Sequence, residues 1–216
     1  MATPANTITI GEVRLSYCNL FQPRAQQPGQ EPKYSVTVLV PKSNIAAKAA
    51  IDAAVNAAID AGVAKVWGGV RPPQPAICVH DGDGPRPSDG MPFGEECKGH
   101  WVFTASCKAD RPPQVVDVNI QSILQQSDVY SGMYGRVSVT FFAYSNSGKK
   151  GIGCGLNAVQ KLRDGEPLGG HISAEEAFGQ MPAYMQQPTA SGQQYQASQP
   201  AYAIDPVTGL PVALPL

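Results

Sequence analysis

The sequence has no long hydrophobic run and no pattern of a secretory signal. No stretch approaches the roughly 20 apolar residues that a membrane-spanning helix needs, and residues 1–12 lack a basic segment followed by an apolar one. The cysteines number five and form no CxxC pair, which argues against a disulfide framework. We therefore expect an intracellular protein in a reducing compartment, without membrane contact.

Catalytic motifs are also absent from the sequence. It contains no HExxH and no GxSxG, and its three histidines have no evident nucleophile as a partner. The segment at 145–155 lacks the first glycine of a phosphate-binding P-loop, and Lys149 is followed by a second lysine instead of Ser or Thr. We predict that the chain is not an enzyme and uses no cofactor.

Basic residues are missing from the last quarter of the chain. All 16 Lys and Arg fall in residues 1–163, together with 12 acids, so this part carries a net charge of +4. Residues 164–216 contain five acids and no base. A basic body followed by an acidic tail is typical of a protein that binds a polyanion.

Short strands and turns dominate the remaining pattern, in keeping with 22 Gly and 20 Pro. Alternating apolar residues predict five strands, at 7–17 (with a bulge at Gly11), 33–40, 101–107, 114–120 and 135–144. An Ala-rich segment capped by Ser43 or Asn44 predicts one helix, with the apolar stripe Ile51, Val55 and Ile59 and an end at Gly62. Two irregular segments, 22–32 and 68–99, are predicted to be loops.

These elements predict a mainly β fold, an OB-fold-like, partly open five-stranded barrel with one inserted helix and long loops. An immunoglobulin-like sandwich is the alternative, but it rarely carries a helix of this length in mid-chain. Residues 1–178 are expected to form this domain. Residues 179–216 are rich in Gln and Pro and are predicted to be disordered. Their apolar end is either a docking peptide for a partner or an end without function.

The clearest signal for a ligand lies between Arg136 and Gly155. With a period of two, one face of the strand is apolar: Val137, Val139, Phe141 and Ala143. The opposite face combines charge, hydroxyls and rings: Arg136, Ser138, Thr140, Phe142 and Tyr144. A turn then leads to the pair Lys149 and Lys150. Positive charge beside exposed rings suits single-stranded nucleic acid, because cations hold the phosphates and rings stack on unpaired bases.

Candidate contacts follow from this chemistry. Base stacking is expected from Phe142 and Tyr144, whose strand already has a complete apolar face, and from Tyr130 and Tyr134. Phosphate contacts are expected from the following cations: Arg14, Lys33, Lys108, Arg136, Lys149 and Lys150. Tyr17, Phe21 and Arg24 belong to the same interleaved pattern. A place in the core is an equally good interpretation for any single ring, and the better one for Trp101 and Phe103.

The sequence does not predict a metal site. Cys78, His80, Cys97 and His100 lie in one irregular segment and together could satisfy tetrahedral zinc. The gap of one residue between Cys78 and His80 is shorter than usual, so buried free thiols and hydrogen-bonded imidazoles are favoured. The DGD at 81–83 lacks the further carboxylates of an EF-hand and is interpreted as a turn.

Several motifs together resemble the single-stranded DNA-binding proteins of tailed bacteriophages. They are YSVTVLVPK (34–42), VWGGVRPP (66–73), GHWVFTAS (99–106), VYSGMYGRVSVTFFAY (129–144) and KGIGCGLNAVQKLRDGEPLGG (150–170). The resemblance covers about residues 7–178. It implies an OB-type fold that coats single-stranded DNA in the cytoplasm of the host cell, without catalysis, during phage replication, recombination or repair. It also implies phage or host replication and recombination proteins as partners of the C-terminal tail.

Two other functions stay open at this point. One is a phage structural or assembly protein whose barrel binds protein and no nucleic acid. The other is a metal-dependent nucleic-acid enzyme that uses the Cys and His set.

Overall fold

The computed structural model of the chain describes residues 3–25, 28–146 and 148–169, and two short strands further on. Residues 1–171 and 172–216 form two separate units. In the second unit, β9 (Tyr202–Ile204) pairs antiparallel with β10 (Pro211–Ala213). The rest of the tail that is predicted to be disordered lies outside the described residues.

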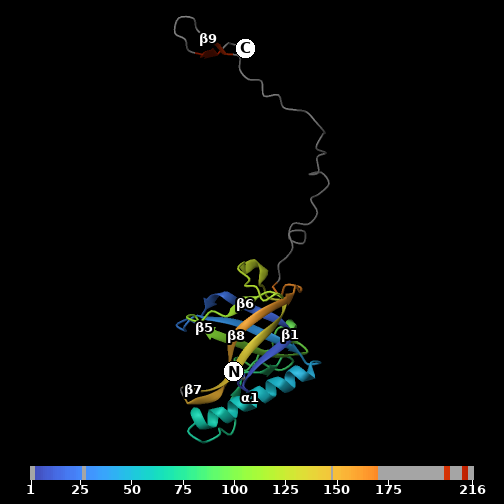
Figure 1. The fold of residues 1–216 in the computed structure, drawn as a ribbon, viewed down its shortest axis with the longest axis vertical. Coiled ribbons are helices and arrows are strands. Elements are labelled where there is room, and N and C mark those ends of the chain that lie inside the picture. The colour runs from blue at the N-terminus through green and yellow to red at the C-terminus, as the bar shows by residue number, and fades with distance from the viewer. Residues whose placement is uncertain (1–2, 26–27, 147, 170–201, 205–210, 214–216) are drawn as a thin grey trace. The chain divides into compact units, whose positions relative to one another are not determined.

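Five long strands close into a barrel in the first unit (Figure 1). They are β1 (Thr7–Arg24), β2 (Lys33–Pro41), β5 (His100–Lys108), β7 (Tyr134–Asn146) and β8 (Lys149–Arg163). The order around the barrel is β1-β2-β5-β8-β7, and β7 pairs back with β1. Every neighbouring pair is antiparallel except β5 and β8, which are parallel. The predicted OB-type barrel is confirmed.

The barrel closes at a narrow seam. Between β5 and β8 the described pairing is a single residue pair, Ser106 with Gly155. The sequence predicts a partly open barrel, whereas the strands meet here and complete the ring. Gly155 has no side chain, so it leaves the outer face of the seam uncovered.

Two of the predicted strands differ from the structure. No strand is predicted over 149–163, where β8 lies, because Gly151, Gly153 and Gly155 are residues that strands usually exclude. The strand predicted at 114–120 is reduced to β6 (Gln114–Val116), which pairs with β8 outside the barrel order. After β6 the chain turns, and Ile120 adopts a left-handed φ of 62°.

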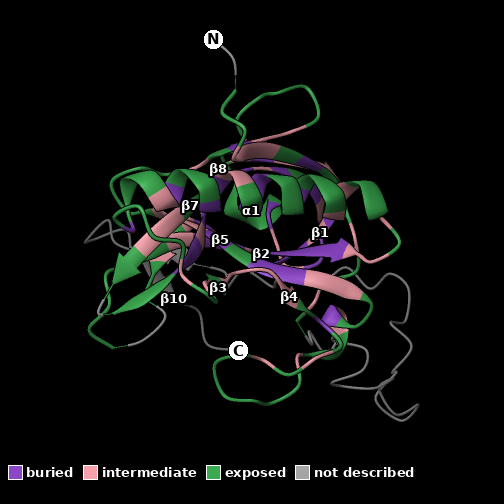
Figure 2. Ribbon diagram, turned by 90° about the horizontal axis from the view of Figure 1, so that it is seen from below, coloured by how far each residue is buried: buried purple, intermediate pink, exposed green. Residues whose placement is uncertain are grey.

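One helix, α1 (Ile45–Lys65), lies across one end of the barrel. Asn44 caps it as predicted, because its side-chain oxygen accepts a hydrogen bond from Ala47 N at 3.0 Å. The predicted stripe is buried, and Figure 2 shows this side of the helix turned toward the strands. The helix continues past Gly62, however, so this glycine does not end it.

Gly62 serves close packing. A Cβ at this position would collide with the Cβ of Ala143 on β7 and lie 3.4 Å from the Trp67 ring. The Trp67 indole also donates a hydrogen bond to Tyr144 O at 3.0 Å. The missing side chain therefore lets α1 approach the end of β7.

The segment between α1 and β5 folds back onto the outside of the barrel. It contains β3 (Ala76–Ile77), β4 (His80–Asp81) and the short helix η1 (Glu95–Cys97), and a second short helix, η2 (Gln126–Asp128), precedes β7. Lys42 holds the turn at 81–83 through ion pairs with Asp81 at 2.5 Å and Asp83 at 2.6 Å. Phe93 packs on a small second core of Leu39, Cys97 and Val102.

Replacing Gly62 by Ala tests this packing, because helix propensity and packing predict opposite signs. Alanine favours a helix by about 1 kcal/mol over glycine, yet overpacking against β7 should lower the free energy of unfolding by about 1–3 kcal/mol. Denaturant unfolding measures the change. As a control, Ala50→Gly on the exposed side of α1 should cost about 1 kcal/mol. A more stable Gly62→Ala variant would contradict the close approach.

Candidate nucleic-acid interface

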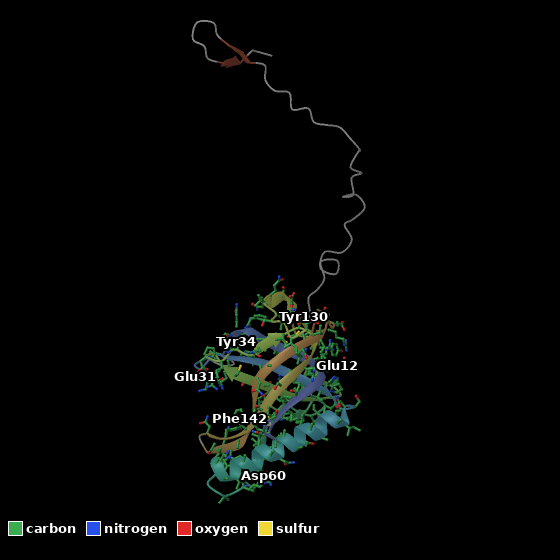
Figure 3. All side chains as sticks on the ribbon, in the orientation of Figure 1. Glu12, Glu31, Tyr34, Asp60, Tyr130 and Phe142 are labelled. Atoms are coloured by element: carbon green, nitrogen blue, oxygen red, sulfur yellow. The ribbon has the colours of Figure 1, made fainter. Side chains whose placement is uncertain are left out.

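The two predicted faces of β7 are present. Val137, Val139 and Phe141 are fully buried, whereas the opposite face points to solvent. Phe142 is 46% exposed and lies at the surface of the barrel (Figure 3). Tyr144 is half-buried on the same face. The ring of Phe142 is therefore a surface feature and not part of the core.

The Phe142 ring rests on a strand without side chains. Gly153 is its partner on β8, and a Cβ built there would lie 2.7 Å from the ring atom Cζ. A Cβ on Gly155 would lie 3.7 Å from Cε1. An aromatic side chain that covers strand glycines in this way stabilises the glycine-rich strand. It also leaves the other π-face of the ring open to solvent.

Three cations lie side by side across the outer face of the barrel. Arg24 on β1 is the register partner of Lys33 on β2, and Lys33 is the partner of Lys108 on β5. All three are exposed, and in the described part of the chain none of their side chains forms an ion pair or a hydrogen bond. Like charges directly opposite one another destabilise a sheet. This cation row therefore fits an anionic ligand.

The hairpin between β7 and β8 adds charge beside the cation row. A pocket of about 370 Å³ lies between them, lined by Arg24, Gln30, Glu31, Lys33, Ser106 and Asn146. Lys149 is the register partner of Asn146 and shares the face of Phe142. Lys150 pairs with Ser145 and points to the other face. Of the two predicted lysines, Lys149 thus extends the cation row.

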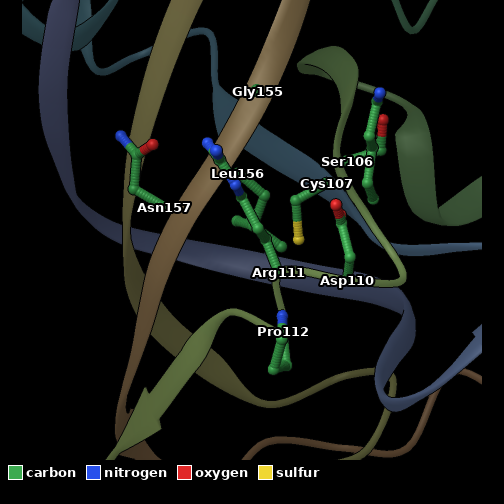
Figure 4. A pocket seen from close by; sticks show the side chains of 9 residues that line it. Ser106, Cys107, Asp110, Arg111, Pro112, Gly155, Leu156 and Asn157 are labelled. Carbon is green, nitrogen blue, oxygen red and sulfur yellow. The ribbon is translucent and has the colours of Figure 1, made fainter.

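A hollow of about 600 Å³ lies over the seam of the barrel, next to the cation row (Figure 4). Its lining includes Ser106, Lys108, Arg111, Gly155 and Asn157. Figure 4 shows the side chain of Arg111 reaching toward β8. Arg111 is not among the residues predicted from the sequence. It follows Lys108 in the turn that ends β5, and its backbone N–H donates to Lys108 O at 3.0 Å.

Hydroxyl groups continue the outer face of β2 and β5 away from the cation row. Ser35 pairs with Ser106, and Thr37 pairs with Thr104. The two threonine hydroxyls are 3.2 Å apart. These pairs have a signal in the sequence, because Lys, Ser and Thr stand at alternate positions of KYSVT and TASCK. In a strand, alternate side chains share one face, so these polar side chains lie on the same side. Together with the cation row, Arg111, Gly155 and Phe142, these pairs form what is called here the groove face.

The predicted aromatic residues at the other end of β7 contact the protein itself. The Tyr130 hydroxyl donates to Asp164 at 2.9 Å, and Lys161 lies 5.4 Å from the centre of its ring. The guanidinium of Arg163 lies 3.5 Å from the Tyr134 ring centre. Figure 3 places Tyr130 toward the opposite end of the barrel from Phe142. The structure does not bring these two tyrosines to the groove face.

Arg14 and Arg136 also lie apart from the groove face. Arg14 is half-buried, donates a hydrogen bond to Glu166 O at 2.8 Å and lies 6.0 Å from the Tyr134 ring centre. Arg136 is exposed on the Phe142 face, but six residues of strand, about 20 Å, separate the two. Lys33, Lys108, Phe142, Tyr144 and Lys149 are thus the predicted residues that lie on or beside the groove face.

The Cys and His set is spread over several environments. Burial raises the pKa of Cys78 to about 11. Burial and the neighbouring Glu96 raise the pKa of Cys97 to about 11, so both are neutral thiols at pH 7. Burial lowers the pKa of His80, whose ring stacks on Phe93 at 6.5 Å. Among the residues that the structure describes, no three His, Cys, Asp or Glu side chains gather as metal ligands would.

A family model for the single-stranded DNA-binding protein of Enterobacter phage Enc34 matches residues 6–188. The chain belongs to this family. The family is one of binding proteins and not of enzymes. A relative in Acyrthosiphon pisum secondary endosymbiont phage 1, named protein p50, is 31% identical over 179 residues, which cover 79% of this chain and 91% of the relative. No helix within the described residues is long and apolar enough to cross a membrane.

Solved structures of phage proteins share this fold. The Enc34 family protein in complex with single-stranded DNA is 28% identical, with a TM-score of 0.65 over 76% of this chain and 90% of that one. The single-stranded DNA-binding protein gp2.5 of bacteriophage T7 matches with a TM-score of 0.51 over 82% of this chain and 95% of that one. At 13% identity, gp2.5 supports the fold alone.

The cation row predicts a gain in stability when a charge is removed. Lys108→Gln should raise the free energy of unfolding by up to about 1 kcal/mol at low ionic strength, because it relieves repulsion from Lys33. The gain should shrink in salt, which screens the repulsion. Urea unfolding at two salt concentrations measures both effects. The control Lys65→Gln removes a cation from the last turn of α1 and should destabilise slightly. A loss of stability in Lys108→Gln would show that the lysines do not repel each other.

Proposed function

We propose that the chain binds single-stranded DNA without sequence preference across the groove face, in phage DNA replication, recombination or repair. The observation that carries this is the cation row, without ion pairs among the described residues, beside the open ring of Phe142. Membership of the family supports single-stranded DNA as the ligand. The Enc34 relative in complex with single-stranded DNA shares the fold over most of its length.

In this proposal the cations and the rings have separate tasks. Arg24, Lys33, Lys108 and Lys149 neutralise phosphates, an interaction that any sequence offers equally. Phe142 stacks on a base through its exposed face, and Tyr144 lies next along β7 for a second base. Between them, Thr37, Thr104 and Ser106 offer hydroxyl groups without adding bulk, whereas Ser35 is buried. Neither kind of contact reads the identity of a base, so binding is independent of sequence.

The remaining expected contacts have lesser parts in the proposal. Arg136 and Lys150 add to the positive field around the groove face. Arg14, Tyr130 and Tyr134 hold the end of the barrel near residues 164–166 together. Residues 179–216 recruit replication or recombination proteins in the cytoplasm of the host cell, a role that suits a segment without bases.

The salt dependence of binding tests the phosphate contacts. For the wild-type chain, log Kd measured with an oligo(dT) should rise with log salt by about 0.7 per phosphate neutralised. Lys33→Gln and Lys108→Gln should each weaken binding and reduce the slope by about 0.7, because each removes one contact. Fluorescence anisotropy titrations at several salt concentrations give both quantities. Lys65→Gln on α1 is the control and should leave affinity and slope unchanged. Equal slopes for all four proteins would exclude phosphate contacts by the cation row.

Stacking by Phe142 is tested by a matched pair of substitutions. Phe142→Leu keeps apolar bulk over Gly153 but removes the π-face, so affinity for oligo(dT) should fall by about 1–3 kcal/mol for each base that stacks. Phe142→Tyr keeps the ring and should bind like the wild type. Because leucine still covers Gly153 and the position is half exposed, thermal unfolding should show at most a small loss of melting temperature in Phe142→Leu and none in Phe142→Tyr. Equal affinity of the Leu and Tyr variants would mean that no base stacks on this ring.

A further inference from the structure

A second pocket opens on the outside of the barrel beyond the hydroxyl pairs. It measures about 400 Å³, within the usual range of small-molecule sites of roughly 300–1,000 Å³. The side chains that matter here are Tyr17, Thr37, His80, Phe93, Glu96 and Thr104. Threonines 37 and 104 lie both in this pocket and on the groove face. The pocket is therefore continuous with the surface that leads to the cation row.

One side of the pocket is formed by the ring of Tyr17, whose backbone conformation is unfavourable. Tyr17 is 67% exposed and has a left-handed φ of 47°. It sits where the pairing of β1 with β2 shifts register between Ser16 and Asn19. A bulge re-aims a side chain, and a bulky residue in this conformation is strained, a feature that clusters at active sites and ligand-binding positions. The Tyr17 ring packs in no core cluster.

Aromatic rings also lie beyond the two threonines, because the strand order β1-β2-β5-β4 places His80 on the far side of Thr37 and Thr104 from Tyr17. His80 and Phe93 stack with their rings 6.5 Å apart and inclined by 26°. Phe93 packs on the second core, and β4, which carries His80, pairs with β5 through Val102. Flat groups on two sides and hydroxyls between them match the shape and chemistry of a nucleobase.

The charges in the pocket oppose a phosphate as its occupant. Glu96 contributes a carboxylate to the lining. Arg86, the cation of this pocket, forms an ion pair with Asp89 at 2.8 Å and is neutralised by it. An uncharged planar base fits this environment, while its phosphate stays with the cations of the groove face.

We propose that this pocket takes one nucleobase of the bound strand, stacked on Tyr17 and facing His80 and Phe93. The inference rests on the proposed function, since it needs a strand on the groove face. It adds a stacking position on β1, faced by His80 and Phe93 of the segment that folds onto the barrel and separate from Phe142 on β7.

The test compares two ligands of equal charge, an oligo(dT) and an abasic oligomer of the same length. Tyr17→Gly removes the ring and places at this position the residue that suits a left-handed backbone, so the variant should fold at least as stably as the wild type. It should bind oligo(dT) about 5-fold or more weakly, as expected for one lost stack. Its affinity for the abasic oligomer and its salt slope should equal those of the wild type. Tyr17→Phe keeps the ring and should match the wild type on both ligands.

Two results would overturn the inference. If Tyr17→Gly binds oligo(dT) as tightly as the wild type, or weakens on both ligands by the same factor, the pocket holds no base while the proposed function stands. If the wild-type protein binds neither oligomer, the proposed function fails and the pocket fails with it.

Discussion

At alternate positions of β8, glycines leave the outer face of the barrel without side chains. Gly153 provides the flat surface on which Phe142 lies, and Gly155 forms the pair with Ser106 that closes the ring of strands. Gly151 has the carbonyl of Ala76 and the hydroxyl of Tyr144 where a side chain would be. A side chain at Gly151 or Gly153 would collide with its neighbours, and one at Gly155 would cover part of the open surface beside Phe142.

The distribution of ion pairs explains how a chain with a net charge of −1 presents a basic surface. Two of the paired cations join distant segments: Lys42 holds the segment that folds back onto the barrel, and Arg163 binds Glu12 at 2.8 Å. The other ion pairs of the described residues join side chains three or four positions apart. The cation row has no such partners within the described residues. Its members repel one another across adjacent β-strands, which lowers the stability of the fold. Bound single-stranded DNA, being anionic, would remove this repulsion. Net charge alone conceals this division, because it adds the two kinds of cation together.

Sequence patterns were sufficient for features that depend on local periodicity. They predicted four of the five barrel strands, the Asn44 cap, the buried stripe of α1 and the exposed face of Phe142. They failed where tertiary contacts override local preference. Gly62 is typical of a helix end but serves packing against Ala143. The glycines of β8 are typical of a loop but form a strand, where Phe142 lies over Gly153 and Tyr144 lies beside Gly151.

The candidate site was only partly predictable for the same reason. Lys33, Lys108 and Phe142 could be chosen from their own strands, but their proximity depends on the pairing of β2 with β5 and of β5 with β8. Nothing local distinguishes Tyr134 from Phe142. Only the fold shows that Arg163 covers the ring of Tyr134.

Photocross-linking tests the placement of the DNA strand most directly. Oligomers that carry iododeoxyuridine form a covalent bond to an aromatic side chain stacked on the base, and mass spectrometry of the digested protein identifies the residue. We expect cross-links at Phe142 on the groove face, and none at Tyr130 or Tyr134. Cross-links confined to those two tyrosines would contradict this expectation and would place the strand at the opposite end of the barrel.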